Sequence, residues 1–284
     1  MTGARTGMVV KVVPTTELVT VVIPSFNHRT YVETAVRSVL AQTYPNVQLI
    51  VIDDGSSDGS REFLQELATR EGFDFISQEN SGVCRALNRA IRDHARGRFI
   101  ALLGSDDYWV PEKLELQMSR LRQERDAEFC FAQAITFHDE PSDASGSPFP
   151  GRPREGYVSR HVLLRQHVPA GTMLFTRRLY DRLGGFDEAL KEEDWDFVIR
   201  AAASTRFVAV QRPLLLYRAH PQNVMRTRSR SAIFHQKVLV FAKNFPLAPP
   251  GIWMISLLVH FFHDVVMGGI IQSFQRYRMR RANR

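Results

Sequence analysis

Short apolar runs alternate with helical patterns along residues 18–103, and this alternation constrains the fold more than any other feature. Each run is rich in β-branched residues and stops at small or polar residues, as strands buried on both faces do. The segments between the runs carry apolar residues at helical spacing. We expect the strands over residues 18–23, 47–52, 73–76 and 99–103. This rhythm predicts an α/β fold with a mostly parallel sheet that is flanked by helices.

The sequence after residue 103 predicts more strands and helices of the same domain. Residues 139–156 are rich in Pro, Gly, Ser and Asp, which indicates an exposed loop. We expect helices over 111–121 and 192–203, and strands over 127–137, 172–175, 207–210 and 214–217. The predicted organisation is a loose leader at 1–17, one α/β domain at 18–235 and a helical tail at 236–284.

Composition narrows the class of protein. The chain has 284 residues, 44% of them hydrophobic, which is enough for a large core. Cys84 and Cys130 show neither a disulfide framework nor metal-ligand spacing, so we expect a reducing, intracellular setting. The net charge of +7 permits nucleic acid, anionic lipid or phosphorylated substrates as partners. We expect no nucleic acid partner, because the sequence contains neither a zinc-finger nor a helix-turn-helix signature.

Polar loops follow the predicted strands at residues 24–27, 53–58, 79–82 and 104–107. In a parallel sheet the carboxyl ends of the strands share one edge, so these loops should meet there. The last loop contains Asp106 and Asp107. This pair has two interpretations: a cap of the next helix, or a site for a divalent cation that bridges a diphosphate.

Taken together, Pro24-Ser25-Phe26-Asn27, Asp53-Asp54 and Ser105-Asp106-Asp107 resemble the inverting family-2 glycosyltransferases of the GT-A fold, over roughly residues 18–220. The resemblance implies a nucleotide-diphospho-sugar donor and a divalent cation, Mn²⁺ or Mg²⁺. It implies that Asp107 binds the metal and that Asp106 lies near the ribose. Many members carry another Asp where this chain has Gly104. The implied donor-binding residues are Pro24, Ser25, Phe26, Asn27, Asp54, Asn80, Gly82, Ser105 and Asp106, and Asn88 matches an Asn on the following helix.

Acidic residues recur at 192–196, after the turn Gly184-Gly185-Phe186-Asp187. They could simply favour a helix N-terminus through the macrodipole. The resemblance instead implies that Asp194 is the general base and that Glu193 and Trp195 bind the acceptor. An inverting displacement needs one carboxylate to take the proton of the acceptor hydroxyl, which suits this role.

Tyr217-Arg218-Ala219-His220 resembles a context in which family members often place a histidine at the metal or the diphosphate. His220 is therefore a predicted metal ligand, and the alternative is a polar surface residue. The next loop carries Arg226, Arg228 and Arg230. It could close over donor phosphates, or its arginines could simply be solvated.

The tail contains 14 apolar residues between Ile252 and Ile271, with polar residues along one stripe of a helix. Five arginines follow between Arg276 and Arg284. Asp264 near the centre and the arginines beyond it argue against a membrane-spanning helix. The remaining alternatives are a helix over 252–284 that lies on a membrane surface, and one that packs on the core or forms a homo-oligomer.

These observations predict an enzyme that transfers a sugar to a saccharide or a lipid-linked saccharide in the synthesis of a cell-surface polysaccharide. Its expected location is the cytoplasmic, inner face of the cell membrane. The alternative is a protein of similar fold that binds nucleotide-sugars or transfers nucleotides without sugar transfer. A nucleotidyltransferase would need a phosphate-binding Gly-rich loop with a nearby Lys, and residues 24–29 offer neither.

Overall fold

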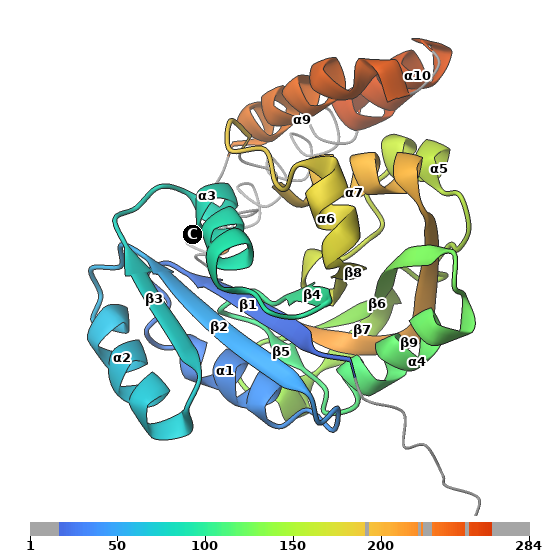
Figure 1. Ribbon diagram of the computed structural model, residues 1–284. Helices are drawn as coiled ribbons and strands as arrows, with labels where there is room; N and C mark the ends of the chain where they lie inside the picture. The colour runs from blue at the N-terminus through green and yellow to red at the C-terminus, as the bar shows by residue number, and fades with distance from the viewer. Residues whose placement is uncertain (1–16, 191–192, 221–222, 224–228, 248–249, 263–284) are drawn as a thin grey trace, which may run out of the picture.

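One curled sheet runs through the computed structural model, which describes residues 17–190, 193–220, 223, 229–247 and 250–262 (Figure 1). Nine strands form it within these residues, in the order β3-β2-β1-β4-β8-β6-β9-β5, with β7 paired to β6. The strands are β1 Val19–Ser25, β2 Val47–Asp54, β3 Asp74–Gln78, β4 Phe99–Leu102, β5 Tyr108–Trp109, β6 Ala127–Phe137, β7 Ser145–Phe149, β8 Leu174–Thr176 and β9 Arg206–Arg218.

Strand direction changes halfway across this sheet. β1 pairs in parallel with both β2 and β4, and β2 pairs in parallel with β3. Beyond them β8 runs antiparallel to β4 and β6, whereas β6 and β9 are parallel. The parallel half therefore collects its carboxyl ends at one edge, as the sequence predicts.

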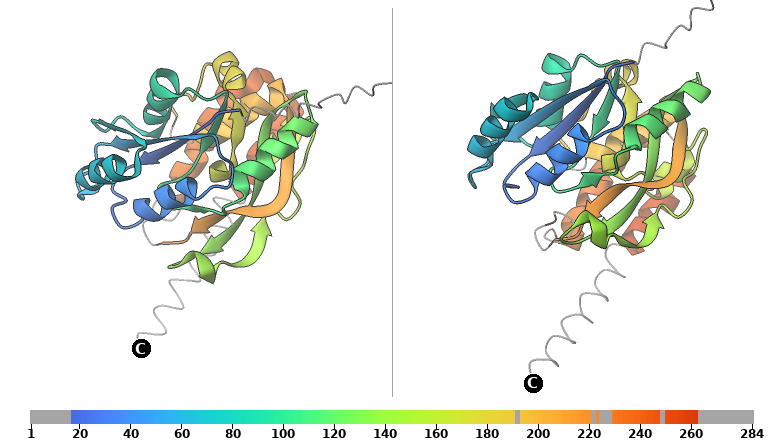
Figure 2. Two further views of the ribbon diagram at one scale, coloured as in Figure 1. Left: turned by 60° about the horizontal axis from the view of Figure 1, so that its bottom comes forward. Right: turned by 90° about the horizontal axis from the view of Figure 1, so that it is seen from below.

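Helices cover both faces of the sheet (Figures 1 and 2). One core contains α1, α2 and α4, which pack on Val21 and Val51. The other contains α3, α5, α6, α7, α9 and α10, which pack around Ile50, Ile100 and Phe175. The helices are α1 Val32–Leu40, α2 Ser60–Glu71, α3 Val83–Arg89, α4 Lys113–Gln123, α5 Ser159–Leu164, α6 Arg177–Leu183, α7 Glu193–Ser204, α9 Arg230–Asn244 and α10 Pro250–Phe261.

Most predicted elements are present, and the differences have local causes. The predicted loop at 139–156 contains β7, whose Phe149 and Ser145 pair with β6. The two strands predicted at 207–210 and 214–217 form one strand, β9, with register shifts where β6 passes Pro213. Proline lacks the N–H of a ladder hydrogen bond, so it disturbs the strand without ending it. The short elements β5, α5 and α6 were not predicted.

The C-terminal helices α9 and α10 pack on the body of the protein and lie beside each other in Figure 1. The predicted domain boundary at 235/236 falls inside α9. Residues 263–284, with Asp264 and the five arginines, lie outside the described part of the structure. Among the described residues, no helix is both long enough and apolar enough to cross a membrane.

Candidate active site

A cleft of about 530 Å³ lies at the carboxyl edge of the parallel strands. His28 and the segment Glu188–Leu190 form part of its lining. Another cavity, of about 620 Å³, lies at the amino ends of the strands beside Arg98 and Glu128, far from the polar loops. The cleft at the carboxyl edge is therefore the candidate site. Its wall contains seven of the predicted donor-binding residues, namely Pro24, Ser25, Phe26, Asp54, Asn80, Gly82 and Ser105.

Two loops are tied together at the rim of this cleft. Asn27 adopts a positive φ of 54°, its N–H donates to Ser56 Oγ at 2.8 Å, and its Oδ1 accepts from Ser57 N at 2.8 Å. Asn27 is thus a structural link between the β1 and β2 loops and does not line the cleft. Gly55 lies against the next loop, where an added Cβ would stand 2.6 Å from the backbone nitrogen of Asn80. Only glycine permits this approach, so residue 55 sets how closely the β2 and β3 loops meet.

Asp54 shapes the floor of the cleft through charge-assisted hydrogen bonds. Its Oδ1 accepts from Gln78 Nε2 at 2.7 Å and from Ser81 N at 2.9 Å. Its Oδ2 accepts from Gly82 N at 2.8 Å. Bonds of this kind are stronger than those between neutral groups. The predicted donor residues Asp54 and Gly82 are therefore bonded to each other as well as facing the same cleft.

Three side chains from distant parts of the chain meet beside the cleft. His28, Asp106 and His220 each offer a ligand atom, and these atoms lie within 4.8 Å of one another. His220 Nε2 is 3.0 Å from Asp106 Oδ2, and His28 Nδ1 is 2.8 Å from Ser105 Oγ. Burial lowers the pKa of His28, an effect that Asp106 opposes and His220 reinforces. A lowered pKa keeps the imidazole neutral, which is the form that binds metals.

Asp107 is turned away from this group. Its side chain is buried, and its Oδ1 accepts from Arg218 N at 3.0 Å. Burial raises the pKa of Asp107 well above its usual value, and the neighbouring Asp106 adds to the shift. The sequence assigned the metal to Asp107 and the nucleoside to Asp106. In the structure Asp107 accepts a hydrogen bond from the β9 backbone and Asp106 lies with the two histidines. Both assignments stay predictions.

Gly104 precedes this acidic pair at a crowded point. An added Cβ would lie 3.0 Å from Asp106 Oδ1 and 3.1 Å from Asp107 Oδ2. A carboxylate at residue 104 would thus point toward two others, and like charges at such distances repel. The glycine keeps this place free of a third negative charge.

The predicted acceptor residues lie at the start of α7. Asp194 is half-buried, and Gln166 Nε2 donates to its Oδ2 at 3.3 Å. Burial raises the pKa of Asp194. Trp195 is only 2% exposed, its Nε1 donates to Val162 O at 3.0 Å, and its ring packs against Phe241 and His260. The indole is therefore a core side chain with no open face for an acceptor. Glu193 begins α7, and its side chain lies outside the described part.

Hydrogen bonds fix the segment between α6 and α7 that reaches the cleft. Asn88 Nδ2 donates to Phe186 O at 2.8 Å and to Glu188 Oε1 at 2.9 Å. Cys84 Sγ donates to Leu190 O at 3.3 Å. Helix α3 thus holds residues 186–190 against the donor loops. Asn88 acts as a positioning residue here, because its amide is occupied by the protein.

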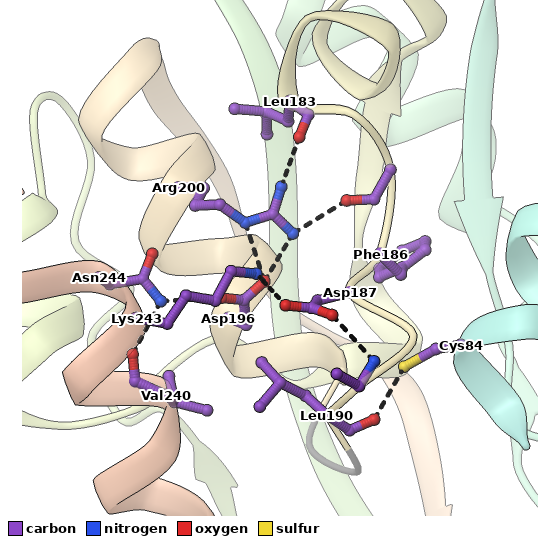
Figure 3. A network of polar contacts seen from close by, with 12 residues as sticks. Cys84, Leu183, Phe186, Asp187, Leu190, Asp196, Arg200, Val240, Lys243 and Asn244 are labelled. Atoms are coloured by element: carbon purple, nitrogen blue, oxygen red, sulfur yellow. Dashed lines mark hydrogen bonds and ion pairs between the residues drawn. The ribbon is translucent and has the colours of Figure 1, made fainter.

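A buried network attaches the other end of this segment to α7 and α9 (Figure 3). Asp196 is fully buried, and its Oδ2 accepts from Arg200 Nη2 at 2.6 Å and from Lys243 Nζ at 3.1 Å. Asn244 Nδ2 donates to its Oδ1 at 2.7 Å. Arg200 also donates to the carbonyls of Leu183 and Gly185. The network therefore couples the Gly-Gly turn and the start of α7 to α9.

Comparison with known proteins agrees with this arrangement. The model of "Glycosyl transferase family 2" matches residues 20–184, and that of "Glycosyltransferase like family 2" matches residues 153–245. The chain belongs to glycosyl transferase family 2. The putative glycosyltransferase EpsH of Bacillus subtilis is 30% identical to it over 246 residues, which are 81% of this chain and 68% of EpsH.

Two further relatives match a shorter stretch. The putative teichuronic acid biosynthesis glycosyltransferase TuaG of Bacillus subtilis is 41% identical over 116 residues, or 40% of this chain and 45% of TuaG. An Escherichia coli glucosyltransferase, WfgD, whose name gives UDP-Glc as donor and a GlcNAc-diphosphoundecaprenol acceptor, is 39% identical over 104 residues. The match covers 37% of this chain and 41% of WfgD, so the chain spans less than half of TuaG and WfgD.

Two solved structures share the fold. S. aureus TarS 1–349 in complex with UDP-GlcNAc superposes with a TM-score of 0.69 at 17% identity, covering 87% of this chain and 73% of that one. The mannosyltransferase PcManGT of Pyrobaculum calidifontis, in complex with GDP-Man and Mn²⁺, superposes with a TM-score of 0.62 at 21% identity. The match covers 88% of this chain and 70% of PcManGT. The predicted GT-A-like fold and family are confirmed.

His28 is the residue at this site that the sequence reasoning missed. It directly follows the stretch Pro24–Asn27, which the resemblance assigned to the donor. No spacing in the sequence links it to His220, 192 positions later, and only the fold brings them together. The signal was the residue type itself, a histidine at a strand-end loop.

Proposed function

We propose that this protein transfers a sugar from a nucleotide-diphospho-sugar to a saccharide or lipid-linked saccharide, with inversion and with a divalent cation, in cell-surface polysaccharide synthesis. One observation carries the proposal: the cleft lined by the predicted donor residues adjoins the His28–Asp106–His220 cluster. A nucleoside fits the cleft, and its diphosphate would extend to the cluster. The nucleotide-sugar in the TarS structure and the names of TuaG and WfgD support the same class of reaction.

The cleft contains polar groups that a nucleotide would satisfy. Ser25 Oγ is buried in its wall and has no hydrogen-bond partner among the described residues. Phe26 is 47% exposed at the same wall and offers an aromatic face. A hydroxyl without a partner costs free energy until a ligand completes it. Ser25 therefore donates or accepts a hydrogen bond when the donor binds, and Phe26 packs against the base.

The cation site consists of His28, Asp106 and His220, whose chemistry fits a divalent metal. Imidazole and carboxylate ligands together suit Mn²⁺ better than Mg²⁺, which prefers oxygen ligands alone. When bound, the ion would neutralise negative charge on the departing nucleoside diphosphate. The Mn²⁺ in the PcManGT structure supports a metal of this class. Asp107, the next residue in the chain, is fixed by the hydrogen bond that it accepts from the β9 backbone.

Asp194 takes the proton from the acceptor hydroxyl in this proposal. Its burial raises the pKa, which makes the carboxylate a stronger base than one in water. Gln166 holds the carboxylate in place. The segment Glu188–Leu190, which precedes α7 in the chain, lines the cleft, and this supports an acceptor-side role for the start of α7. A single base without a covalent intermediate agrees with inversion.

The test combines transfer and binding in one pair of proteins. Asp194→Asn should bind the nucleotide-sugar and Mn²⁺ with unchanged affinity in calorimetry, while release of nucleoside diphosphate in the presence of acceptor falls by about 10²–10⁴-fold. Asp181→Asn, an exposed carboxylate on α6, is the matched control and should keep full turnover. Turnover near that of the natural protein in Asp194→Asn would remove this residue from the role of base. Donor binding without any transfer in the natural protein would favour a binding protein instead.

A further inference from the structure

Helix α10 presents an apolar face to the outside of the protein. Six large side chains at its outer side are between 45% and 64% exposed. Most of them have another member three or four positions away, which places them on one side of α10 and of the residue that directly follows it. These residues are Met254, Ile255, Leu258, Val259, Phe261 and Phe262. We call this set the α10 outer face.

The polar residues of α10 lie on the opposite, inner side. Ser256 is fully buried and its Oγ donates to Leu163 O in α5. His260 is 6% exposed, and its Nδ1 lies 3.3 Å from Lys237 Nζ of α9. A helix in contact with water has the reverse arrangement, with its apolar residues inside. Trp253, Ile252 and Leu257 pack on the core beside this polar stripe, so α10 is attached through both. The six exposed apolar side chains are left uncovered by the described residues.

The charge of the sequence around α10 indicates which kind of partner the α10 outer face would bind. Between Pro250 and Arg284 the sequence contains five arginines and one acidic residue, Asp264. An apolar helix face combined with adjacent arginines is the pattern of helices that lie in the interface of an anionic bilayer. A second copy of the chain would carry the same net charge of +7, which disfavours pairing. The lipid surface therefore fits both the apolar face and the charge.

The position of α10 relative to α7 adds a reason for lipid at this place. The inner side of α10 covers Trp195, whose ring centroid is 4.8 Å from that of His260. Trp195 directly follows Asp194, the proposed base. A bilayer on the α10 outer face would therefore lie beside the acceptor side of the site. This argument for a membrane-anchored acceptor rests on the proposed function, whereas docking itself does not.

We propose that the α10 outer face docks on an anionic lipid bilayer and lies in its interface without crossing it. Apolar side chains enter the boundary between headgroups and acyl chains, while the polar stripe keeps α10 attached to α5 and α9. Because the docking residues are exposed, replacing them leaves the fold intact. This property separates the proposal from a simple packing role of the helix.

The experiment measures sedimentation of the full chain with vesicles of phosphatidylcholine alone or mixed with phosphatidylglycerol. The double variant Ile255→Ser/Leu258→Ser should lose at least about tenfold in partitioning to the mixed vesicles, as expected for removing two large apolar side chains. Leu40→Ser, 43% exposed on α1 and far from α10, is the matched control and should partition like the natural protein. High salt should weaken the binding without abolishing it, because part of the attraction is apolar.

Three results would overturn the proposal. One is equal partitioning of the double variant and the natural protein. Another is equal binding to neutral and anionic vesicles, which would remove the role of charge. The third is a dimer in sedimentation velocity that the double variant dissociates, without vesicle binding, which would assign the face to a second copy. Donor binding by calorimetry, measured in parallel without lipid, should be the same in all three proteins. A loss of docking is thereby distinguished from failure of the proposed function.

Discussion

Lys113 is a fully buried residue at the start of α4 that packs against Trp109, and removing its amine should stabilise the protein. Its Nζ is buried without a hydrogen-bond partner in the described part, 3.6 Å from the ring centroid of Trp109. Trp109 follows Asp107 closely and donates to Gly171 O at 2.7 Å. Burial lowers the pKa of Lys113 from 10.5 to about 7. Lys113→Met shortens the side chain by one heavy atom and removes the amine.

The size of the expected stabilisation follows from the linkage between the pKa of Lys113 and the free energy of unfolding. A fall from 10.5 to about 7 corresponds to about 5 kcal/mol at about 1.4 kcal/mol per unit. The actual destabilisation is smaller, because the protonated amine of Lys113 is attracted to the face of the Trp109 ring. Between these two pKa values the unfolded chain binds the proton and the folded chain does not. Unfolding free energy therefore rises with pH by up to about 1.4 kcal/mol per unit in the natural protein. The unfolding free energy of Lys113→Met lacks this dependence on pH.

Urea unfolding at about pH 7, 8 and 9 measures the difference between the two proteins. The pKa of Cys130 is raised to about 12 by burial, so the thiol begins to lower stability only above about pH 9. The variant should be more stable by about 2–5 kcal/mol at pH 7, and its advantage should shrink as pH rises. Arg125→Met, an exposed cation just beyond α4, should show no such trend. A difference independent of pH, or a variant less stable at pH 7, would refute the reasoning.

Two further predictions concern residues that shape the site. Asp54→Asn places an amide against Ser81 N and Gly82 N, so calorimetry should show nucleotide-sugar affinity lower by about 10–100-fold; unchanged affinity would show that the loop keeps its shape without the charge. Asp196→Asn breaks the network of Figure 3 and should lower unfolding free energy in urea by about 3–5 kcal/mol. Asp181→Asn breaks an exposed pair with Arg177 and should cost below about 1 kcal/mol; equal losses would contradict the role of burial.

The sequence predicted the parallel half of the sheet and the residues at its edge, because each of these signals is local. A β-branched run that stops at Pro24-Ser25 or at Asp54 indicates a strand end by itself. The β-strand at Ala127–Phe137 was likewise predicted with its bounds. Pairing is not local: β7 within a Pro- and Gly-rich segment, and β5 with two residues, exist only because β6 and β9 offer partners.

Side-chain direction limited the prediction of the site. Asp106 and Asp107 are adjacent, so no pattern tells which carboxylate lies with the two histidines and which accepts from Arg218 N. Trp195 was expected at the acceptor, but its burial depends on Phe241 and His260 from helices that are far along the chain. The sequence showed the polar stripe of the tail but not that the stripe faces the protein. Its direction depends on α5, because Ser256 donates a hydrogen bond to Leu163 O there.

The central claim is that Asp106, with the two histidines, holds a metal that the nucleotide needs. Calorimetric titration of UDP, GDP and dTDP, with and without Mn²⁺, tests it most directly in the natural protein, Asp106→Asn and the exposed control Asp126→Asn. We predict that Mn²⁺ raises affinity for one of these nucleotides at least about tenfold in the natural protein and the control, and that Asp106→Asn loses this gain. A full Mn²⁺-dependent gain in Asp106→Asn, or nucleotide binding indifferent to Mn²⁺ throughout, would contradict the account.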